Sequence, residues 1–458
     1  MSRFKEIIVI LAVLLGLWSA LSLPIGMTAE QAAIFGMVLV TLSLWATGLT
    51  PGYVASAFFF TALLLGNLST PDVVFSGFTS TAMWLVVAGF VIGAAITTSG
   101  LGARIGGLTH RHLSRSYPML IGGLMVVSMV LGFVMPASTG RAAVMVPIGM
   151  ALADALGLKP GTKGRTGVAI VIAIGTNMPS FAILPSNIPN VLMSGLADQL
   201  FDIQLSYLDY LLLHYPVLGL AKSAAIVGLV LTFFPARLDT EIRPAKTVAS
   251  ASGRKQGALL VILLITLVLW STDQIHGINP AWVGLATAVV LMIPNVGFLS
   301  PPAFKSAIDF GTLLFIAGAL ALGVVVNRSG LGDIIAHEAL TRLPIQPGQD
   351  FLNFMSLSLL GAGTSIFTTM PGVPAVLTPL ASELATLTGF STEAVLMTQV
   401  IGFSTVLFPY QVGPLIVAMG LAGESTRPLL KVTVALFLLT ALILIPADYL
   451  WWKLLGVI

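Results

Sequence analysis

Met135-Pro-Ala-Ser-Thr-Gly-Arg141 interrupts a long apolar stretch of the chain and leaves an arginine near the start of the next one. A similar break, Phe367-Thr-Thr-Met-Pro-Gly-Val-Pro374, interrupts the second half. Each break frees backbone N–H and C=O groups, and an unpaired group in hydrocarbon is strongly unfavourable. Such segments survive in a membrane only where protein buries them or where they line a wet cavity. The two breaks therefore predict hairpin tips inside a membrane-spanning helical protein.

The composition of the whole chain supports this interpretation. Of 458 residues, 57% are hydrophobic and only 9% are charged, whereas about a quarter of the residues in a soluble protein are charged. The absence of cysteine excludes disulfides and thiolate sites, and a net charge of +3 gives no nucleic-acid surface. No phosphate loop with Gly-Lys-Ser/Thr is present. We expect a protein that is not an enzyme and has no ATP motor of its own.

Lysine and arginine residues set the orientation in the membrane. They gather before the first apolar stretch, after the fourth, in the loop 159–165 and in the polar segment 236–256, while the intervening loops carry acidic residues. If the basic segments are cytoplasmic, 117–157 and 351–389 must each enter and leave the membrane on one face. The sequence therefore predicts an all-α polytopic protein of the cell inner (plasma) membrane, with a cytoplasmic N-terminus and two re-entrant helical hairpins.

An internal repeat relates the two halves of the chain at an offset of about 230 residues. The run from Gly93 to Gly102 matches that from Gly323 to Gly332, and Ala143-Val-Met-Val-Pro147 matches Ala375-Val-Leu-Thr-Pro379. In the predicted orientation the two copies are inverted. Inverted repeats with broken helices are typical of secondary transporters, whose sites lie near the midplane. An old gene duplication in a channel or a membrane enzyme is the alternative.

Two further breaks follow the hairpins, at Gly175–Asn190 and at Phe408-Pro-Tyr-Gln-Val-Gly-Pro414. A helix that restarts after a break presents N–H groups and a dipole that favour an anion. The carbonyl and hydroxyl groups that each break frees can coordinate a small hard cation. Anion and cation sites side by side are what a coupled symporter needs.

Three polar residues in apolar surroundings call for interpretation. Arg141 could hold a carboxylate or an oxyanion with two parallel hydrogen bonds; the alternatives are that it caps the hairpin through backbone carbonyls or reaches the membrane surface. Lys222, inside an apolar stretch near 216–235, is expected to extend to the lipid headgroups. His214 is expected to be solvated near a helix end.

These features resemble the divalent anion/sodium symporter (DASS) family, whose members carry dicarboxylates, citrate or sulfate, and the resemblance covers most of 1–458. The family motif is Ser-Asn-Thr at each hairpin tip, ten residues before a proline. Here the corresponding positions before Pro147 and Pro379 read Ala137-Ser-Thr139 and Thr369-Met-Pro371. Ser186-Asn-Ile-Pro-Asn190 stands where the family has a Pro-Pro-Asn type of break. The spacing and the architecture match those of the family, whereas the residues at the motif positions differ from Ser-Asn-Thr.

The resemblance implies about 11 transmembrane helices, with two inverted repeats that each hold a re-entrant hairpin and a broken helix. It also implies a homodimer in which a transport domain moves like an elevator against a scaffold. In this chain the scaffold would comprise 1–70, 205–300 with the cytoplasmic loop 236–256, and 430–458. The transport domain would comprise 75–200, with the hairpin 117–157, and 305–425, with the hairpin 351–389.

The predicted function is sodium-coupled symport of a small anion such as a dicarboxylate, citrate or sulfate, in contact with membrane lipid. Arg141 stands where the family has a small residue. Its positive charge could attract the anion in place of the hydrogen bonds that the missing asparagine makes in the family. An anion exchanger or a proton-coupled carrier is the alternative within transport, and a channel-like or pump-associated membrane subunit is the alternative outside it. The expected substrate contacts are Ser138, Thr139, Arg141, Asn187, Asn190, Thr368, Thr369 and Gln411. The expected sodium ligands come from Ala137, Ser138, Gly175, Thr368 and Met370.

Overall fold

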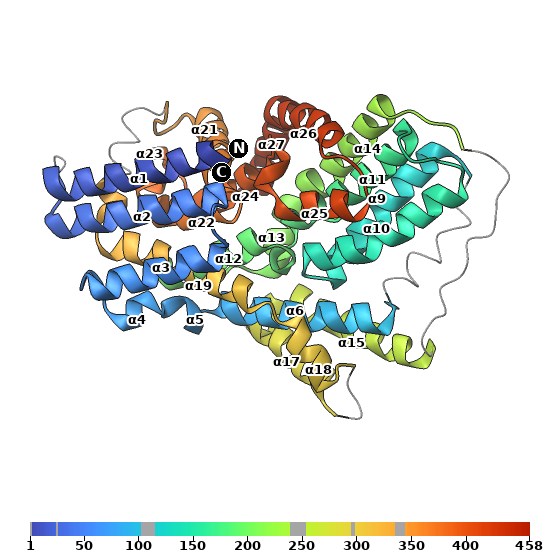
Figure 1. Ribbon diagram of the computed structural model, residues 1–458, viewed down its shortest axis with the longest axis horizontal. Helices are drawn as coiled ribbons and strands as arrows, with labels where there is room; N and C mark the ends of the chain where they lie inside the picture. The colour runs from blue at the N-terminus through green and yellow to red at the C-terminus, as the bar shows by residue number, and fades with distance from the viewer. Residues whose placement is uncertain (1, 24–25, 102–114, 239–252, 295–297, 335–343) are drawn as a thin grey trace.

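The computed structural model describes residues 2–23, 26–101, 115–238, 253–294, 298–334 and 344–458 (Figure 1). Within these ranges the regular elements are all helices. Nine of the described helices are long and apolar enough to cross a membrane, or up to ten if one bent pair counts as a span. The all-α polytopic fold is therefore confirmed. The expected total of about 11 spans stays a prediction, and most of the loop 236–256 lies outside the described ranges.

The chain begins with two helices that pack closely, α1 (Ser2–Ser22) and α2 (Ala29–Thr47). A Cβ atom on Gly16 would lie 3.0 Å from the Cα of Gly36, and such small residues let helix backbones approach each other in lipid. On α1, large side chains such as Trp18 and Leu21 point outward, as expected of a surface that faces acyl chains. The next helix, α3 (Gly52–Leu65), packs along α19 of the second half.

The first half continues with a long helix, a hairpin and a broken helix. These are α6 (Thr81–Ser99), the hairpin arms α9 (Tyr117–Val134) and α10 (Ser138–Ala155), and α11 (Lys163–Gly175). After α11 the chain runs through two short 3₁₀ turns, Met178–Ala182 and Leu184–Ser186, before α12 (Ile188–Phe201). Prolines at 179, 185 and 189 lie within this segment, and because proline lacks an N–H it prevents one continuous helix.

The second half shows the same order of elements. α19 (Phe310–Arg328) corresponds to α6, and α21 (Asp350–Thr368) with α22 (Gly372–Leu377) and α23 (Ala381–Thr388) forms the second hairpin. α24 (Thr392–Ser404) then breaks at the 3₁₀ turn Pro409–Gln411 and restarts as α25 (Gly413–Leu421). This order supports the predicted repeat. Its inversion and the re-entrance of the hairpins stay predictions, since they depend on the position of the membrane.

Further helices lie between and after the two halves. They are α13 (Tyr207–His214), α14 (Lys222–Phe233), α15 (Gly253–Ser271), α17 (Pro280–Met292) and α18 (Pro301–Ala307), then α26 (Arg427–Leu439) and α27 (Ile445–Leu455). The π-helical turns Tyr215–Ala221 and Thr440–Leu444 join α13 to α14 and α26 to α27. α6 packs along α17, so the predicted transport and scaffold segments are in contact. The division into two domains stays a prediction.

Two polar residues of this region lie elsewhere than the sequence suggested. Lys222 is not extended to the headgroups: it is 1% exposed, and its Nζ donates a 2.6 Å hydrogen bond to the carbonyl oxygen of Ser404. His214 is not solvated: it is fully buried between the rings of Tyr210 and Trp452. The physical reason is the same for both, because α26 packs on α14 and α27 on α13, which removes these positions from the surface.

Candidate functional site

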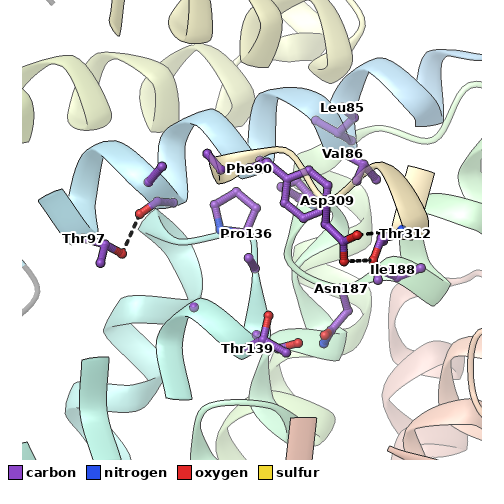
Figure 2. A pocket seen from close by; sticks show the side chains of 18 of the residues that line it. Leu85, Val86, Phe90, Thr97, Pro136, Thr139, Asn187, Ile188, Asp309 and Thr312 are labelled. Carbon is purple, nitrogen blue, oxygen red and sulfur yellow. Dashed lines mark hydrogen bonds between the residues drawn. The ribbon is translucent and has the colours of Figure 1, made fainter. Parts of the chain in front are cut away.

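A cavity of about 560 Å³ lies where the first hairpin tip meets the broken helix of the first half. α6 forms one wall, the tip Pro136–Gly140 and the start of α12 form another, and α18 with the start of α19 closes a third side (Figure 2). The volume lies within the range of pockets that hold small ligands. Its lining is mainly apolar, and the polar side chains among the lining residues are Thr97, Thr98, Ser138, Thr139, Asn187, Ser306, Asp309 and Thr312.

The hairpin tip presents the start of α10 to this cavity. Helix α9 ends at Val134, Met135 and Ala137 are extended, and α10 begins at Ser138 without a side-chain cap on its first N–H groups. The hydroxyls of Ser138 and Thr139 make no hydrogen bond to any other described residue. An uncapped helix N-terminus with two free hydroxyls is a favourable environment for an anion. Ala137 and Ser138, both expected near a cation, also line the cavity.

Asn187 and Asn190 occupy different positions at the break. Asn187 precedes α12 and lines the cavity, and its amide lies 2.8 Å from the Oγ of Ser180. Asn190 is fully buried behind the wall, where its amide nitrogen donates hydrogen bonds of 3.0 Å to the carbonyl oxygens of Phe181 and Ile183. Asn187 is therefore placed to contact a ligand, whereas Asn190 holds the shape of the break.

Arg141 lies behind the cavity wall and is fully buried. Its Nε donates a 2.7 Å hydrogen bond to the carbonyl oxygen of Thr176, and its two terminal nitrogens donate to the carbonyl oxygens of Met135 and Ser186 and to the Oγ of Ser180. One guanidinium thus joins the hairpin tip to the broken helix. In this arrangement its N–H groups point at protein oxygens and it does not line the cavity.

The second hairpin tip is held in a parallel way by Gln411. Its Oε1 accepts hydrogen bonds from the backbone N–H groups of Leu407, at 2.9 Å, and Phe408, at 2.6 Å, and its Nε2 donates to the Oγ of Ser365 on α21. The N–H of Met370 donates to the carbonyl oxygen of Gln411 at 3.2 Å. Of the segment 367–414, only Pro414 lines the cavity. Thr368, Thr369, Met370 and Gln411 therefore lie together but apart from it.

A cluster of carbonyl oxygens lies at the first break, close in sequence to three of the expected sodium ligands, Ala137, Ser138 and Gly175. The carbonyl oxygens of Met135, Thr176 and Ser186 converge at the first break, which is the kind of oxygen cluster that a small cation prefers. Here the guanidinium of Arg141 fills that cluster. Gly175 ends α11 beside it, with Met125 and Ser128 packed against its Cα. This oxygen cluster therefore holds a resident positive side chain, while the expected sodium ligands stay a prediction.

Sequence reasoning missed the walls that α6 and α19 supply. Thr97 and Thr98 come from α6, and Asp309 caps α19, with its two carboxylate oxygens accepting from the N–H and the hydroxyl of Thr312 (Figure 2). One signal was present: Gly89 and Gly93 are spaced one turn apart, and a Cβ on Gly89 would lie 3.1 Å from Pro136. Small residues at this spacing mark close packing of helices in membranes.

Comparisons with known proteins agree with this architecture. A membrane protein of Cupriavidus necator is 25% identical, with 95% of this chain and 90% of the relative covered. The citrate/succinate antiporter of Escherichia coli is 25% identical over 58% of this chain and 57% of its own. The crystal structure of the YdaH transporter of Alcanivorax borkumensis has a TM-score of 0.58 at 15% identity, covering 93% of this chain and 99% of that one, and so shares the fold. Because the model of the sodium:sulfate symporter transmembrane region matches residues 1–458, this chain belongs to that family, whose members are transporters and not enzymes.

Proposed function

We propose that the chain is a secondary active transporter of a small anion with two or more acidic oxygens, such as a dicarboxylate, citrate or sulfate. The observation that carries the proposal is the uncapped start of α10, where free N–H groups and the hydroxyls of Ser138 and Thr139 face a cavity of suitable size. The citrate/succinate antiporter among its relatives supports the same class of substrate.

In this proposal the anion binds with its negative oxygens toward the N-terminus of α10 and the amide of Asn187. Thr97 and Thr98 add polar surface to the facing wall, where their hydroxyls donate to the carbonyl oxygens of Gly93 and Ala94 in the same helix. The remainder of the lining is mainly apolar, and apolar surroundings strengthen a polar contact. Arg141 lies behind the cavity wall and holds the hairpin tip and the break together. Its positive charge is the main reason why the cavity would prefer an anion.

Movement of the anion across the membrane would follow the elevator scheme, with the two hairpins and broken helices as the moving part. The protein would work as a homodimer in the inner membrane with its N-terminus in the cytoplasm. The two hairpin tips are each pinned to their own broken helix by one buried side chain, Arg141 or Gln411. Such internal cross-links let each half move as a unit.

The cavity and the first break bear on two forms of coupling. Symport with sodium, with cation ligands drawn from Ala137, Ser138, Gly175, Thr368 and Met370, is the form that the family name suggests. Anion exchange is the second candidate, and one observation favours it: the carbonyl cluster at the first break is filled by the guanidinium of Arg141. A fixed positive charge in the moving part of the protein has to be neutralised by a bound anion before that part crosses the membrane. Each crossing would then carry an anion in one direction or the other, which gives exchange without sodium.

A single reconstitution separates these forms. Purified protein in liposomes would be given labelled succinate, citrate or sulfate outside, with sodium or choline as the cation, and with or without unlabelled anion inside. Uptake that needs sodium supports symport, and uptake that needs internal anion in choline supports exchange. Flux that neither saturates nor depends on either gradient would overturn the carrier and point to a pore.

The matched variants for this experiment are Ser138→Ala with Thr139→Val in the cavity and Thr61→Val as the control. Thr61 lies on the exposed face of α3, where its hydroxyl bonds only to the carbonyl oxygen of Ala57. We expect the cavity pair to lose uptake at low anion concentration and the control to keep it. Equal uptake by all three proteins would contradict the proposed site.

A further inference from the structure

Outside the cavity, Lys222 and Asp448 form a buried pair of opposite charges. Lys222 begins α14 and is 1% exposed, and Asp448 lies in the first turn of α27 and is fully buried. Their opposite charges attract each other across the helix interface, although no ion pair within 4.0 Å joins these two described residues. Charged groups inside a membrane protein are costly and are usually functional.

The two members of the pair are satisfied unequally. The Nζ of Lys222 donates to the carbonyl oxygen of Ser404 at 2.6 Å and lies 3.4 Å from its hydroxyl. Neither carboxylate oxygen of Asp448 has a hydrogen-bond partner among the described residues, and the indole N–H of Trp452 beside it does not meet hydrogen-bond geometry. A desolvated carboxylate without hydrogen bonds is strongly unfavourable, and binding a proton removes that cost.

Asp273 shows what a buried carboxylate looks like when it is structural. It is 6% exposed, and it accepts hydrogen bonds from the N–H groups of Tyr207, at 2.6 Å, and Gln274, at 2.9 Å, and from the hydroxyl of Ser206, at 3.2 Å. Asp273 and Asp448 are the two buried acidic side chains of the described residues. Only the second lacks hydrogen bonds to its charged form.

Other titratable groups surround the pair. His214 of α13 is fully buried with neither ring nitrogen hydrogen-bonded to a described residue, and its ring centroid lies 4.7 Å from that of Tyr210 and 5.8 Å from that of Trp452. The elements packed around the pair carry further titratable side chains: Tyr207, Asp209 and Tyr210 of α13, Tyr215 of the first π-helical turn, Tyr117 of α9, Lys163 and Arg165 of α11, Asp350 of α21, Glu393 of α24, Arg427 and Lys431 of α26, and Tyr449 and Lys453 of α27. Unpaired polar groups at this density are unusual in a folded interior.

The backbone marks the same place independently. One π-helical turn, Tyr215–Ala221, ends directly before Lys222, and the other, Thr440–Leu444, ends four residues before Asp448. The two turns contact each other. π-Helical turns are rare and occur frequently at functional sites.

Lys222 also connects the pair to the second broken helix. Ser404 is the last residue of α24. In the break that follows, the N–H groups of Leu407 and Phe408 donate hydrogen bonds to the side chain of Gln411. A positive charge at the C-terminal end of a helix is favoured by the helix dipole. The charge state of the pair therefore acts directly on the end of the half-helix that would move during transport.

We propose that Asp448 and Lys222 form a proton-binding site that links proton binding to movement of the second broken helix, an inference that rests on the proposed transport function. In the binding step a proton from water forms an O–H bond on Asp448, while Lys222 keeps its three protons. The pair changes from neutral to a single positive charge. Release of the proton on the other side of the membrane reverses the step.

The first test detects the proton without any transport. Infrared difference spectra of the full-length protein in lipid, recorded between alkaline and acidic buffer, should show the C=O stretch of a newly protonated carboxyl group. We expect Asp448→Asn to lose this band and the control Asp273→Asn to keep it. If the band persists undiminished in Asp448→Asn, the proton site is wrong.

A double variant keeps the test usable if Asp448→Asn does not fold. Removing one member of a buried pair leaves the other charge uncompensated, whereas replacing both is often tolerated. Lys222→Gln with Asp448→Asn should therefore fold and lack the infrared band. A folded double variant that keeps the band overturns the assignment.

The second test measures coupling in liposomes that hold a pH-sensitive dye. The wild type should move protons together with whichever anion of the panel it transports, and the double variant should move protons only as fast as protein-free liposomes. Anion flux without proton movement in the wild type would overturn the coupling. If no anion moves at all, the proposed function fails, and the infrared band still decides whether the proton site exists.

Discussion

The Nε atom of Arg141 donates a 2.7 Å hydrogen bond to the carbonyl oxygen of Thr176, which joins the start of α10 to the end of α11. The two residues belong to different interrupted segments of the first half. The other nitrogens of the same guanidinium reach Met135, Ser180 and Ser186. The hairpin tip and the broken helix are therefore held by one buried cation, and the shape of the cavity depends on it.

Replacing Arg141 should cost both stability and transport. A lysine carries the charge but cannot direct donors to four acceptors in one plane, and a glutamine lacks the charge. Each buried carbonyl left without a partner costs about 1–3 kcal/mol. We expect Arg141→Lys to unfold at a lower temperature than the wild type, and Arg141→Gln to unfold lower still, with uptake lost in both. Normal uptake by both variants would show that Arg141 has no part in transport.

Removing the free hydroxyls of the first tip should affect binding without affecting stability. Ser138 and Thr139 make no hydrogen bond to other described residues, so the double variant Ser138→Ala with Thr139→Val should unfold at the wild-type temperature. A hydrogen bond to a charged ligand contributes about 1.5–3 kcal/mol, which corresponds to a rise of about tenfold or more in the half-saturating anion concentration. Thermal shift measured against anion concentration checks this. A large loss of stability without ligand would indicate a structural role instead.

The parts of the site that the sequence predicted are those marked by local chemistry. Prolines and glycines inside apolar stretches indicated the tip at Ser138 and Thr139 and the break at Asn187, because such residues cannot continue a helix. The role of Arg141 stayed open between ligand and capping, since a sequence does not show where a buried guanidinium points. The structure now places its donors on protein oxygens.

The parts that the sequence could not predict depend on distant packing. Lys222 and Asp448 are 226 positions apart, and neither π-helical turn has a recognisable sequence signature. Uniformly apolar helices also give no amphipathic pattern to show which side faces lipid and which faces protein. For this reason Lys222 and His214 were expected at the surface, and α6 was not expected in the cavity wall.

Gln411 gives a second prediction about the interrupted helices. In Gln411→Met the N–H groups of the half-buried Leu407 and Phe408 lose their acceptor, and a fully buried group left unsatisfied would cost about 1–3 kcal/mol. We expect a clear fall in unfolding temperature and a loss of uptake, because the second tip is no longer fixed to its break. Gln349→Met is the matched control, since Gln349 is exposed and bonds only to Gln346 through its side chain. Equal stability of the two variants would contradict the bridging role.

A close contact between two helices of the second half supplies the last prediction. A Cβ on Gly402 would lie 2.7 Å from the Cα of Gly361 and 2.8 Å from the carbonyl oxygen of Ser358. These atoms belong to the backbone of α21 and cannot move aside without separating the hairpin from α24. Overpacking of this kind costs about 1–3 kcal/mol, so Gly402→Ala should unfold at a lower temperature. Gly228→Ala is the control, since Gly228 of α14 has nothing within 4 Å of its added Cβ, and alanine in a helix gains about 0.5–1 kcal/mol over glycine. Opposite shifts of the two unfolding temperatures are therefore expected, and shifts in the same direction would show that α21 and α24 do not pack this closely.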